Sequence, residues 1–442
     1  MTDTDILIIG GGITGLSAAY HLQRLNFSDY LLAEKNAACG GLCGSVRKNG
    51  FTYDYSGHLL HLHSGYGKKL VKKLLRGNLG RLSRDTAIFS HGVYTRYPFQ
   101  ANTYGLPPAV VKECVDGFLK AHRADRTVSP DAPFKDWALA VFGPGICRHF
   151  MHPYNRKLWQ TPLDELTADW CAPFVPRPNP QDVIAGSKAD NLKQFGYNAD
   201  FYYPLRGGCQ TLCDALAKPV KNIRTGCELT AIDFIAGTAF FKGLGAVRFK
   251  RVINTMPLKK FVKLIKHAPV KVENAAEKLK ITSVCNLNAG VARRVSEKHW
   301  VYFPEKEFPF YRAGLASNFS PHVAPEGTSS FYIEVSHPQT GRGSRPDLEK
   351  IQRAIPPALR RAGLLGPGEK LLNPLWMKLD DAYVVYNRER KPALETIMPY
   401  LEKHGCLSIG RYGAWKYSFM EEALLEGRAA AVELAGRLKP VR

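Results

Sequence analysis

Short apolar runs separated by glycine-rich turns dominate the first forty residues. The run 6–9 is isoleucine-rich and is bounded by Asp5 and Gly10, which is typical of a strand buried on both faces of a parallel sheet. Small and apolar residues continue over 16–22, and a second apolar run, 30–33, ends in Glu34. This order of strand, glycine turn, helix and strand predicts a βαβ unit at the N-terminus.

Longer periodic segments follow, and they differ in period. Segments 109–122, 134–156 and 348–362 have helical spacing, whereas 283–288 and 330–335 alternate as antiparallel strands do. The proline-rich stretch 173–180 cannot be regular helix, so we expect a loop or hinge over a cleft. The last alanine-rich segment, ending near 438, predicts a C-terminal helix.

These elements predict an α/β fold with three regions in its 442 residues. We expect a discontinuous Rossmann-like FAD-binding domain over 1–85, 203–265 and 386–442. We expect a helical domain over 105–172, and an antiparallel-sheet substrate domain over 86–104, 173–202 and 266–385.

Composition narrows the class of protein. With 45% hydrophobic and 23% charged residues the chain has an ordinary globular balance, and no run approaches a transmembrane length. Its net charge of +22 favours anionic partners, or only solubility, and no nucleic-acid-binding module is present in the sequence. Ten cysteines lack metal-type spacing, and the start lacks a signal peptide, so we expect reduced thiols, no metal and a cytoplasmic location. The oligomeric state stays open.

The first glycine turn carries specific chemistry. Gly10, Gly12 and Gly15 fit GxGxxG between a strand and a helix, where glycines let the backbone approach a pyrophosphate at the helix N-terminus. Glu34 ends the second strand about 20 residues on, where a carboxylate can accept the ribose hydroxyls of an adenosine. Dinucleotide binding is therefore predicted.

The next segments choose FAD over NAD. Glu34 and Lys35 lead to a second glycine turn over 39–45, which contains Gly41 and Leu42, and then to 50–54. This arrangement resembles the flavin-binding amine oxidase superfamily, whose last helix returns to the flavin. Gly410 and Arg411 begin a matching return. The resemblance implies that these residues and Tyr417 bind FAD.

Further segments resemble UDP-galactopyranose mutases, spread from residue 5 to residue 435. The matching pieces are 56–58, 97–100, 153–159, Asn198 with 206–208, 300–304, 310–312, 317–321, Tyr383 and 410–417. The resemblance implies a flavin-dependent nucleotide-sugar mutase in which N5 of reduced FAD attacks the anomeric carbon of an anionic UDP-sugar, without net redox change. It also implies a reductant, NAD(P)H or a reductase, that keeps the flavin reduced.

The resemblance assigns roles that suit the side chains. Arg312 matches the arginine that holds the leaving diphosphate, a role for which a planar guanidinium is suited. His58 matches the residue that contacts the isoalloxazine, and Gly57 can turn its peptide to face a reduced flavin. Substrate contacts are implied for uracil by Tyr97, Gln100, Trp300 and Tyr302, for the diphosphate by Tyr383 and Tyr417, and for the sugar by Asn155, Trp159 and Asn198.

Two positions depart from the mutase pattern. A second arginine on a mobile loop is replaced here by Phe174, and we expect Arg177, three residues later, to substitute for it. Ser56 stands where the family has the first glycine before His58. The chain also lacks the insertion that eukaryotic members carry before the final helix.

Two other functions remain open. An FAD-dependent oxidase or desaturase of the amine oxidase and protoporphyrinogen oxidase superfamily would have an apolar cleft that Arg312 would disturb. A binding protein without catalysis, like the GDP-dissociation inhibitors of this architecture, is disfavoured by the intact glycine motif. The mutase hypothesis requires that Arg312 face the flavin cavity and not be buried against a carboxylate.

Overall fold

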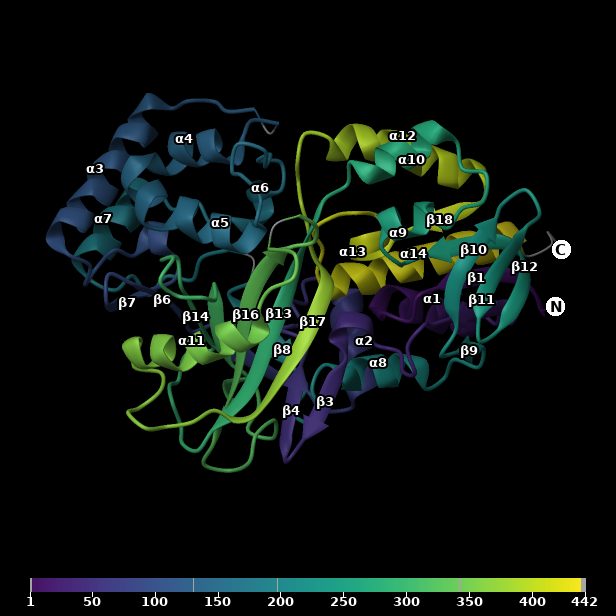
Figure 1. Ribbon diagram of the computed structural model, residues 1–442, viewed down its shortest axis with the longest axis horizontal. Coiled ribbons are helices and arrows are strands. Elements are labelled where there is room, and N and C mark those ends of the chain that lie inside the picture. Colours follow the sequence, from purple (N-terminus) through teal and green to yellow (C-terminus); the bar gives the residue numbers. More distant parts are fainter. Residues whose placement is uncertain (1, 130, 197, 342, 439–442) are drawn as a thin grey trace.

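The computed structural model describes residues 2–129, 131–196, 198–341 and 343–438. Two seven-stranded sheets form its frame, and a group of helices lies beside the second sheet (Figure 1). The α/β class predicted from the sequence is confirmed. The predicted FAD-binding domain runs to 442, and residues 439–442 lie outside the described residues.

The first sheet contains the predicted βαβ unit. Strand β1 (Thr2–Ile9) pairs in parallel with β2 (Tyr30–Ala33) and with β12 (Gly245–Asn254), because its apolar residues are buried on both faces. The other strands are β9 (Ile223–Arg224), β10 (Glu228–Asp233), β11 (Thr238–Lys242) and β18 (Cys406–Ser408). These strands come from three distant parts of the chain, so this domain is discontinuous.

The first and last helices pack on each other beside this sheet. Helix α1 (Ile13–Arg24) lies against α14 (Met420–Leu438), as Figure 1 shows. A methyl group on Gly427 would overlap the backbone of Thr14, so the absence of a side chain permits the close crossing. The C-terminal helix thereby reaches the glycine turn that precedes α1.

The second sheet is mainly antiparallel, and one of its faces is covered by a helix. Its order is β17 (Leu372–Val384), β13 (Ile281–Val291), β16 (Ser329–Pro338), β15 (Arg312–Leu315), β14 (Trp300–Tyr302), β6 (Thr86–Ser90) and β7 (Val93–Arg96). Helix α11 (Leu348–Arg361) packs its apolar face on alternate residues such as Phe331 and Ile333. The residues between them, including Tyr332 and Glu334, point to the opposite face.

The helical group contains α3 (Pro108–Ala124), α4 (Phe134–Ile146), a π-helical segment (Cys147–Met151) and α5 (His152–Trp159). The single helix predicted over 134–156 is broken, because Gly143 adopts φ +73° where it meets the backbone of Gly117 in α3. The stretch 173–180 is not wholly irregular, since α6 (Cys171–Phe174) enters it and α7 (Pro180–Lys188) begins at its end.

Several more strands and α-helices belong to the described chain. They are the hairpin of β3 (Ser45–Lys48) and β4 (Phe51–Asp54), the pair β5 (Gly80–Ser83) and β8 (Asp200–Tyr203), and the helices α2 (Gly65–Leu75), α8 (Gln210–Ala217), α9 (Leu258–Val262), α10 (Val270–Glu277), α12 (Arg390–Lys403) and α13 (Gly410–Gly413). All ten cysteines are free thiols. Among the described helices, none has the length and apolarity that crossing a bilayer would need.

Candidate functional site

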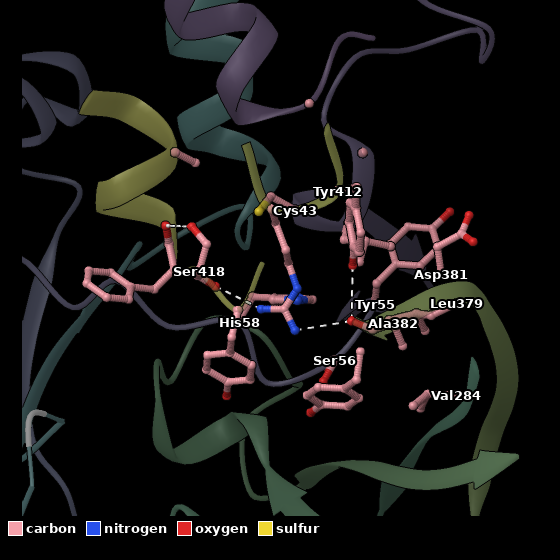
Figure 2. Close-up of a pocket in the computed structure, with 18 of the residues that line it drawn as sticks. Cys43, Tyr55, Ser56, His58, Val284, Leu379, Asp381, Ala382, Tyr412 and Ser418 are labelled. Carbon is pink, nitrogen blue, oxygen red and sulfur yellow. Dashed lines mark hydrogen bonds between the residues drawn. The ribbon is translucent and has the colours of Figure 1, made fainter. Parts of the chain in front are cut away.

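A cavity of about 980 Å³ runs from the glycine turn of the first sheet to the open face of the second sheet. Figure 2 shows part of its wall, where Tyr55, Ser56 and His58 lie near Ala382 and Tyr412. The residues predicted from the sequence that line it are Gly10, Gly12, Glu34, Lys35, Gly41, Leu42, Gly57, His58, Tyr97, Gln100, Asn155, Asn198, Trp300, Tyr302, Arg312, Tyr383, Arg411 and Tyr417.

Each of the three glycines of the first turn is required for a different structural reason. Gly10 adopts φ +101°, which disfavours any other residue. A methyl group on Gly12 would meet no atom within 4 Å, so the N-terminus of α1 is open to the cavity there. Gly15 packs directly on the carbonyl of Gly10 and does not line the cavity. Gly12 thus leaves room for a pyrophosphate, while Gly15 permits helix packing.

Glu34 is held in place beside this opening. Its Oε2 accepts a hydrogen bond from the Gly11 amide at 2.7 Å, and its Oε1 accepts one from the Asn36 amide at 2.8 Å. Although Glu34 is buried, it still borders the cavity. An oriented carboxylate next to an open helix N-terminus fits the ribose and pyrophosphate of FAD.

The segment 410–417, which precedes the C-terminal helix, borders the cavity at the end expected to hold the cofactor. Arg411 donates hydrogen bonds to the carbonyls of Ser418 at 2.8 Å and Ala382 at 3.1 Å, and Tyr412 donates to Ala382 at 3.2 Å (Figure 2). The Arg411 guanidinium also lies 4.8 Å from the centre of the Tyr417 ring. Gly410, at φ +79°, packs against Thr14 and lies outside the cavity lining.

His58 contributes a neutral imidazole to the wall. Burial lowers the pKa of His58 to about 4, nearby Arg411 lowers it further, and Glu334 opposes the change. Nδ1 of His58 has no hydrogen-bond partner among the described residues. The ring is therefore uncharged at neutral pH, and it has one nitrogen available for a ligand.

Arg312 faces the cavity but is paired with a carboxylate. Arg312 on β15 and Glu334 on β16 are register partners, so their side chains meet on the same face. Arg312 donates to Glu334 through Nε, and through Nη2 at 2.8 Å, while the Ser56 hydroxyl donates to the same carboxylate. Burial disfavours the charge, but Glu334 outweighs it and raises the pKa of Arg312 well above its ordinary value.

This pair contradicts one part of the requirement set from the sequence, because Arg312 is buried against a carboxylate. Arg312 lies at the cavity as expected, yet Glu334, which is 1% exposed, neutralises it. Arg312 therefore adds no net positive charge to the site. Among the described residues its hydrogen bonds use only Nε and Nη2, so Nη1 remains for a ligand.

Aromatic rings gather at the end of the cavity expected to hold uracil. The rings of Tyr97 and Tyr302 stack with centroids 5.3 Å apart, and the Arg84 guanidinium lies 4.6 Å from the centre of the Tyr97 ring. Gln100 donates from Nε2 to the Pro176 carbonyl at 2.7 Å, whereas its buried Oε1 has no partner in the described chain. A flat wall and a free amide oxygen suit a ligand with a ring and a donor.

The residues expected at the sugar are less available. Trp159 is buried outside the cavity lining and donates its indole N–H to Asn155 at 3.1 Å, and Asn155 donates in turn to the Met151 carbonyl at 2.8 Å. The direct sugar contact expected of Trp159 is thus wrong in this structure. Asn198 does line the cavity, where its amide oxygen accepts from Arg84.

Phe174, which stands where the mutases have a second arginine, contributes an aromatic ring to the cavity. Phe174 lines the cavity with its ring centre 4.4 Å from that of Tyr417. Arg177 does not take over the role expected of it, because it is exposed, lies outside the cavity lining and covers the Trp137 ring at 5.1 Å. Tyr383 lies near Tyr417, with ring centres 6.5 Å apart.

The structure also brings in residues that the sequence analysis missed. Glu334 and Tyr332 alternate with Phe331, Ile333 and Val335 in β16, and this period-2 pattern places both polar side chains on the face opposite α11. Tyr154 and Tyr412 also line the cavity; they lie within the matching segments 153–159 and 410–417, but no role was assigned to them from the sequence.

The chain is similar to known flavoproteins over most of its length. Residues 13–435 match the model of the flavin containing amine oxidoreductase family, so the chain belongs to that family and is an FAD enzyme. A structure of reduced UDP-galactopyranose mutase is similar to it with a TM-score of 0.91 and 28% identity, over 99% of this chain and 95% of that one.

More distant structures share the fold. A putative protoporphyrinogen oxidase from Exiguobacterium sp. 255-15 has a TM-score of 0.75 at 18% identity, over 99% of this chain and 100% of that one. A putrescine oxidase variant has a TM-score of 0.69 at 14% identity, also over 99% and 100%.

Proposed function

We propose that this FAD enzyme is a nucleotide-sugar mutase of the UDP-galactopyranose and galactofuranose type. One observation carries the proposal: the phenols of Tyr383 and Tyr417 and the Tyr97 and Tyr302 stack line the same cavity as the glycine turn and His58. Arg312 lines it too, but its pairing with Glu334 does not meet the condition set from the sequence, so the proposal does not rest on a free arginine charge. The similarity to reduced UDP-galactopyranose mutase over 99% of the chain supports it.

The charge of the site defines how a diphosphate would be bound. Glu334 offsets the charge of Arg312, so the guanidinium offers a directed hydrogen bond from Nη1 in place of a net positive charge. Tyr383 and Tyr417 add neutral phenol donors. We infer that the nucleotide is held chiefly by aromatic stacking and hydrogen bonds, with little net charge attraction.

The cofactor end supplies the chemistry. Reduced FAD, held at the open N-terminus of α1 and by Glu34, would supply a nucleophilic nitrogen for the anomeric carbon. The neutral imidazole of His58 would add no positive charge to the wall of this cavity. Buried side chains around Arg312 exclude water, which would otherwise hydrolyse an activated sugar. We further propose that NAD(P)H or a reductase maintains the reduced flavin.

Interconversion of the two sugar isomers tests the proposal. Protein reduced with dithionite under nitrogen should convert UDP-galactofuranose to UDP-galactopyranose, whereas oxidised protein should not. Ion-pair chromatography measures the conversion. Reduced protein that binds neither UDP nor any UDP-, dTDP- or GDP-sugar would refute the nucleotide-sugar assignment.

A second candidate is an FAD-dependent oxidase or desaturase of the same family. It is favoured by the neutral Arg312 and Glu334 pair and by Phe174, which make the substrate end less cationic than a diphosphate site with two arginines. This candidate predicts that a substrate reduces the flavin. Bleaching of the flavin band by an amine under anaerobic conditions, with reoxidation by air, would support it against the mutase.

A further inference from the structure

Tyr332 on β16 fills a slot that two glycines create. Its register partner on β15 is Gly314, and a methyl group there would overlap the Tyr332 ring. On the other side, a methyl group on Gly57 would lie 2.6 Å from Cζ of Tyr332 and would overlap the hydroxyl. Gly57 is not among the glycines with positive φ. Its lack of a side chain therefore makes room for Tyr332.

The Tyr332 hydroxyl is buried and unpaired at the cavity wall. Tyr332 is 2% exposed, and its hydroxyl has no hydrogen-bond partner among the described residues. The nearby Glu334 carboxylate already accepts from Arg312 and Ser56. Burial raises the pKa of Tyr332, so the hydroxyl stays protonated. A buried hydroxyl without a hydrogen-bond partner is unfavourable, which points to a partner that this conformation does not provide.

The peptide between Gly57 and His58 can be that partner. In this structure the His58 amide donates to the Ser56 carbonyl at 2.9 Å, which closes a tight turn around Gly57. Rotating the peptide would break this bond and redirect the amide and the Gly57 carbonyl. A phenol can both donate and accept, and the Tyr332 hydroxyl lies against Gly57. The unpaired hydroxyl can therefore bond to the peptide in the rotated orientation.

We propose that Tyr332 is a positioning residue that stabilises one of two orientations of the Gly57 and His58 peptide and thereby adjusts the redox balance of bound FAD. Two-electron reduction of FAD adds a proton to the flavin ring and turns an acceptor into a donor, so a flavin held against this peptide would favour a different peptide group in each redox state. Only one orientation uses the Tyr332 hydroxyl. Its removal must then affect the two redox states unequally.

Replacing Tyr332 by phenylalanine tests this role, because Tyr332→Phe keeps the ring in its slot and removes only the hydroxyl. The midpoint potential of the holoprotein is measured with no nucleotide sugar present. Loss of one hydrogen bond of about 1 kcal/mol changes the ratio of reduced to oxidised FAD about fivefold, or ~20 mV for a two-electron couple. The control is Tyr53→Phe, which removes a buried hydroxyl that donates to the Asn373 carbonyl outside the cavity.

The possible results either support or overturn the role of Tyr332. A shift in Tyr332→Phe of that size or more, in either direction, with Tyr53→Phe unchanged, supports the role, and an unshifted potential overturns it. If Tyr332→Phe weakens the binding of oxidised and reduced FAD equally, the potential does not shift and the role is overturned. A lowered apoprotein melting temperature with an unshifted potential assigns the hydroxyl to the fold alone and overturns the role. None of these readouts involves a sugar, so the mutase proposal is tested independently.

Discussion

Glu334 lies directly opposite Arg312 on the neighbouring strand and takes two of its three guanidinium nitrogens. The pair is inseparable from the sheet, since the register that aims Arg312 at the cavity also aims Glu334 there. A side chain that the sequence suggested as a free phosphate ligand is therefore half of a buried ion pair. This arrangement changes which substitutions are informative.

Arg312→Ala should damage the fold as well as binding. It leaves the buried Glu334 carboxylate without its counter-ion, and breaking such a pair costs about 3–5 kcal/mol. Urea unfolding of the apoprotein measures this loss. An unchanged midpoint would mean that the pair does not form in solution.

Glu334→Gln should strengthen the binding of an anionic ligand, in contrast to Arg312→Ala. It keeps a side chain of similar shape but removes the negative charge, so Arg312 gains net charge toward the cavity. We expect UDP to bind the reduced protein about tenfold more tightly, with some loss of stability. Calorimetric titration with UDP checks this expectation, and weaker binding would show that Glu334 itself contacts the nucleotide.

Phe174→Arg should restore a second cation at the substrate end. Phe174 lines the cavity beside Tyr417, so an arginine there can reach an anionic ligand. We expect tighter UDP binding that weakens as salt increases. The matched control is Phe174→Leu, which changes size without charge. Equal affinities for the two variants at low salt would place the diphosphate elsewhere.

Stability should fall as the pH drops from about 6.5 to about 4. The pKa of His58 is about 4 in the folded protein against an ordinary value of 6.5, so over this interval protons bind the unfolded chain preferentially. His61 has the same shift, with burial as its main cause. Denaturation at pH 7, 6 and 5 should show the decline, and His58→Gln should make the slope shallower while His61 still contributes. A slope equal to that of the wild type would contradict the assignment to His58.

The glycines of the first turn should separate folding from cofactor binding. Gly12→Ala meets no atom within 4 Å, so the fold should persist while FAD affinity falls. Gly15→Ala would overlap the Gly10 carbonyl and should cost about 1–3 kcal/mol of stability. The absorbance at 450 nm, divided by the protein concentration, measures how much FAD is bound, and the melting temperature measures stability. Together they distinguish the two effects. A yellow Gly12→Ala protein with normal affinity would move the pyrophosphate away from this turn.

The sequence by itself determined the cofactor end of this protein. An apolar run, GxGxxG, a helix and Glu34 form a local unit whose geometry depends on near neighbours, so spacing alone predicted the βαβ fold. The alternation in 330–335 also carried the information that Tyr332 and Glu334 share a face, although it did not say which strand they would meet.

Tertiary structure decided the substrate end. The pairing of Arg312 with Glu334, the slot of Tyr332 between Gly57 and Gly314, and the turning of Arg177 onto Trp137 all depend on strand register or on packing between distant segments. Residue type and spacing do not contain these contacts. An arginine's charge is visible in a sequence, but whether that charge is compensated depends on which carboxylate the folded backbone places opposite it.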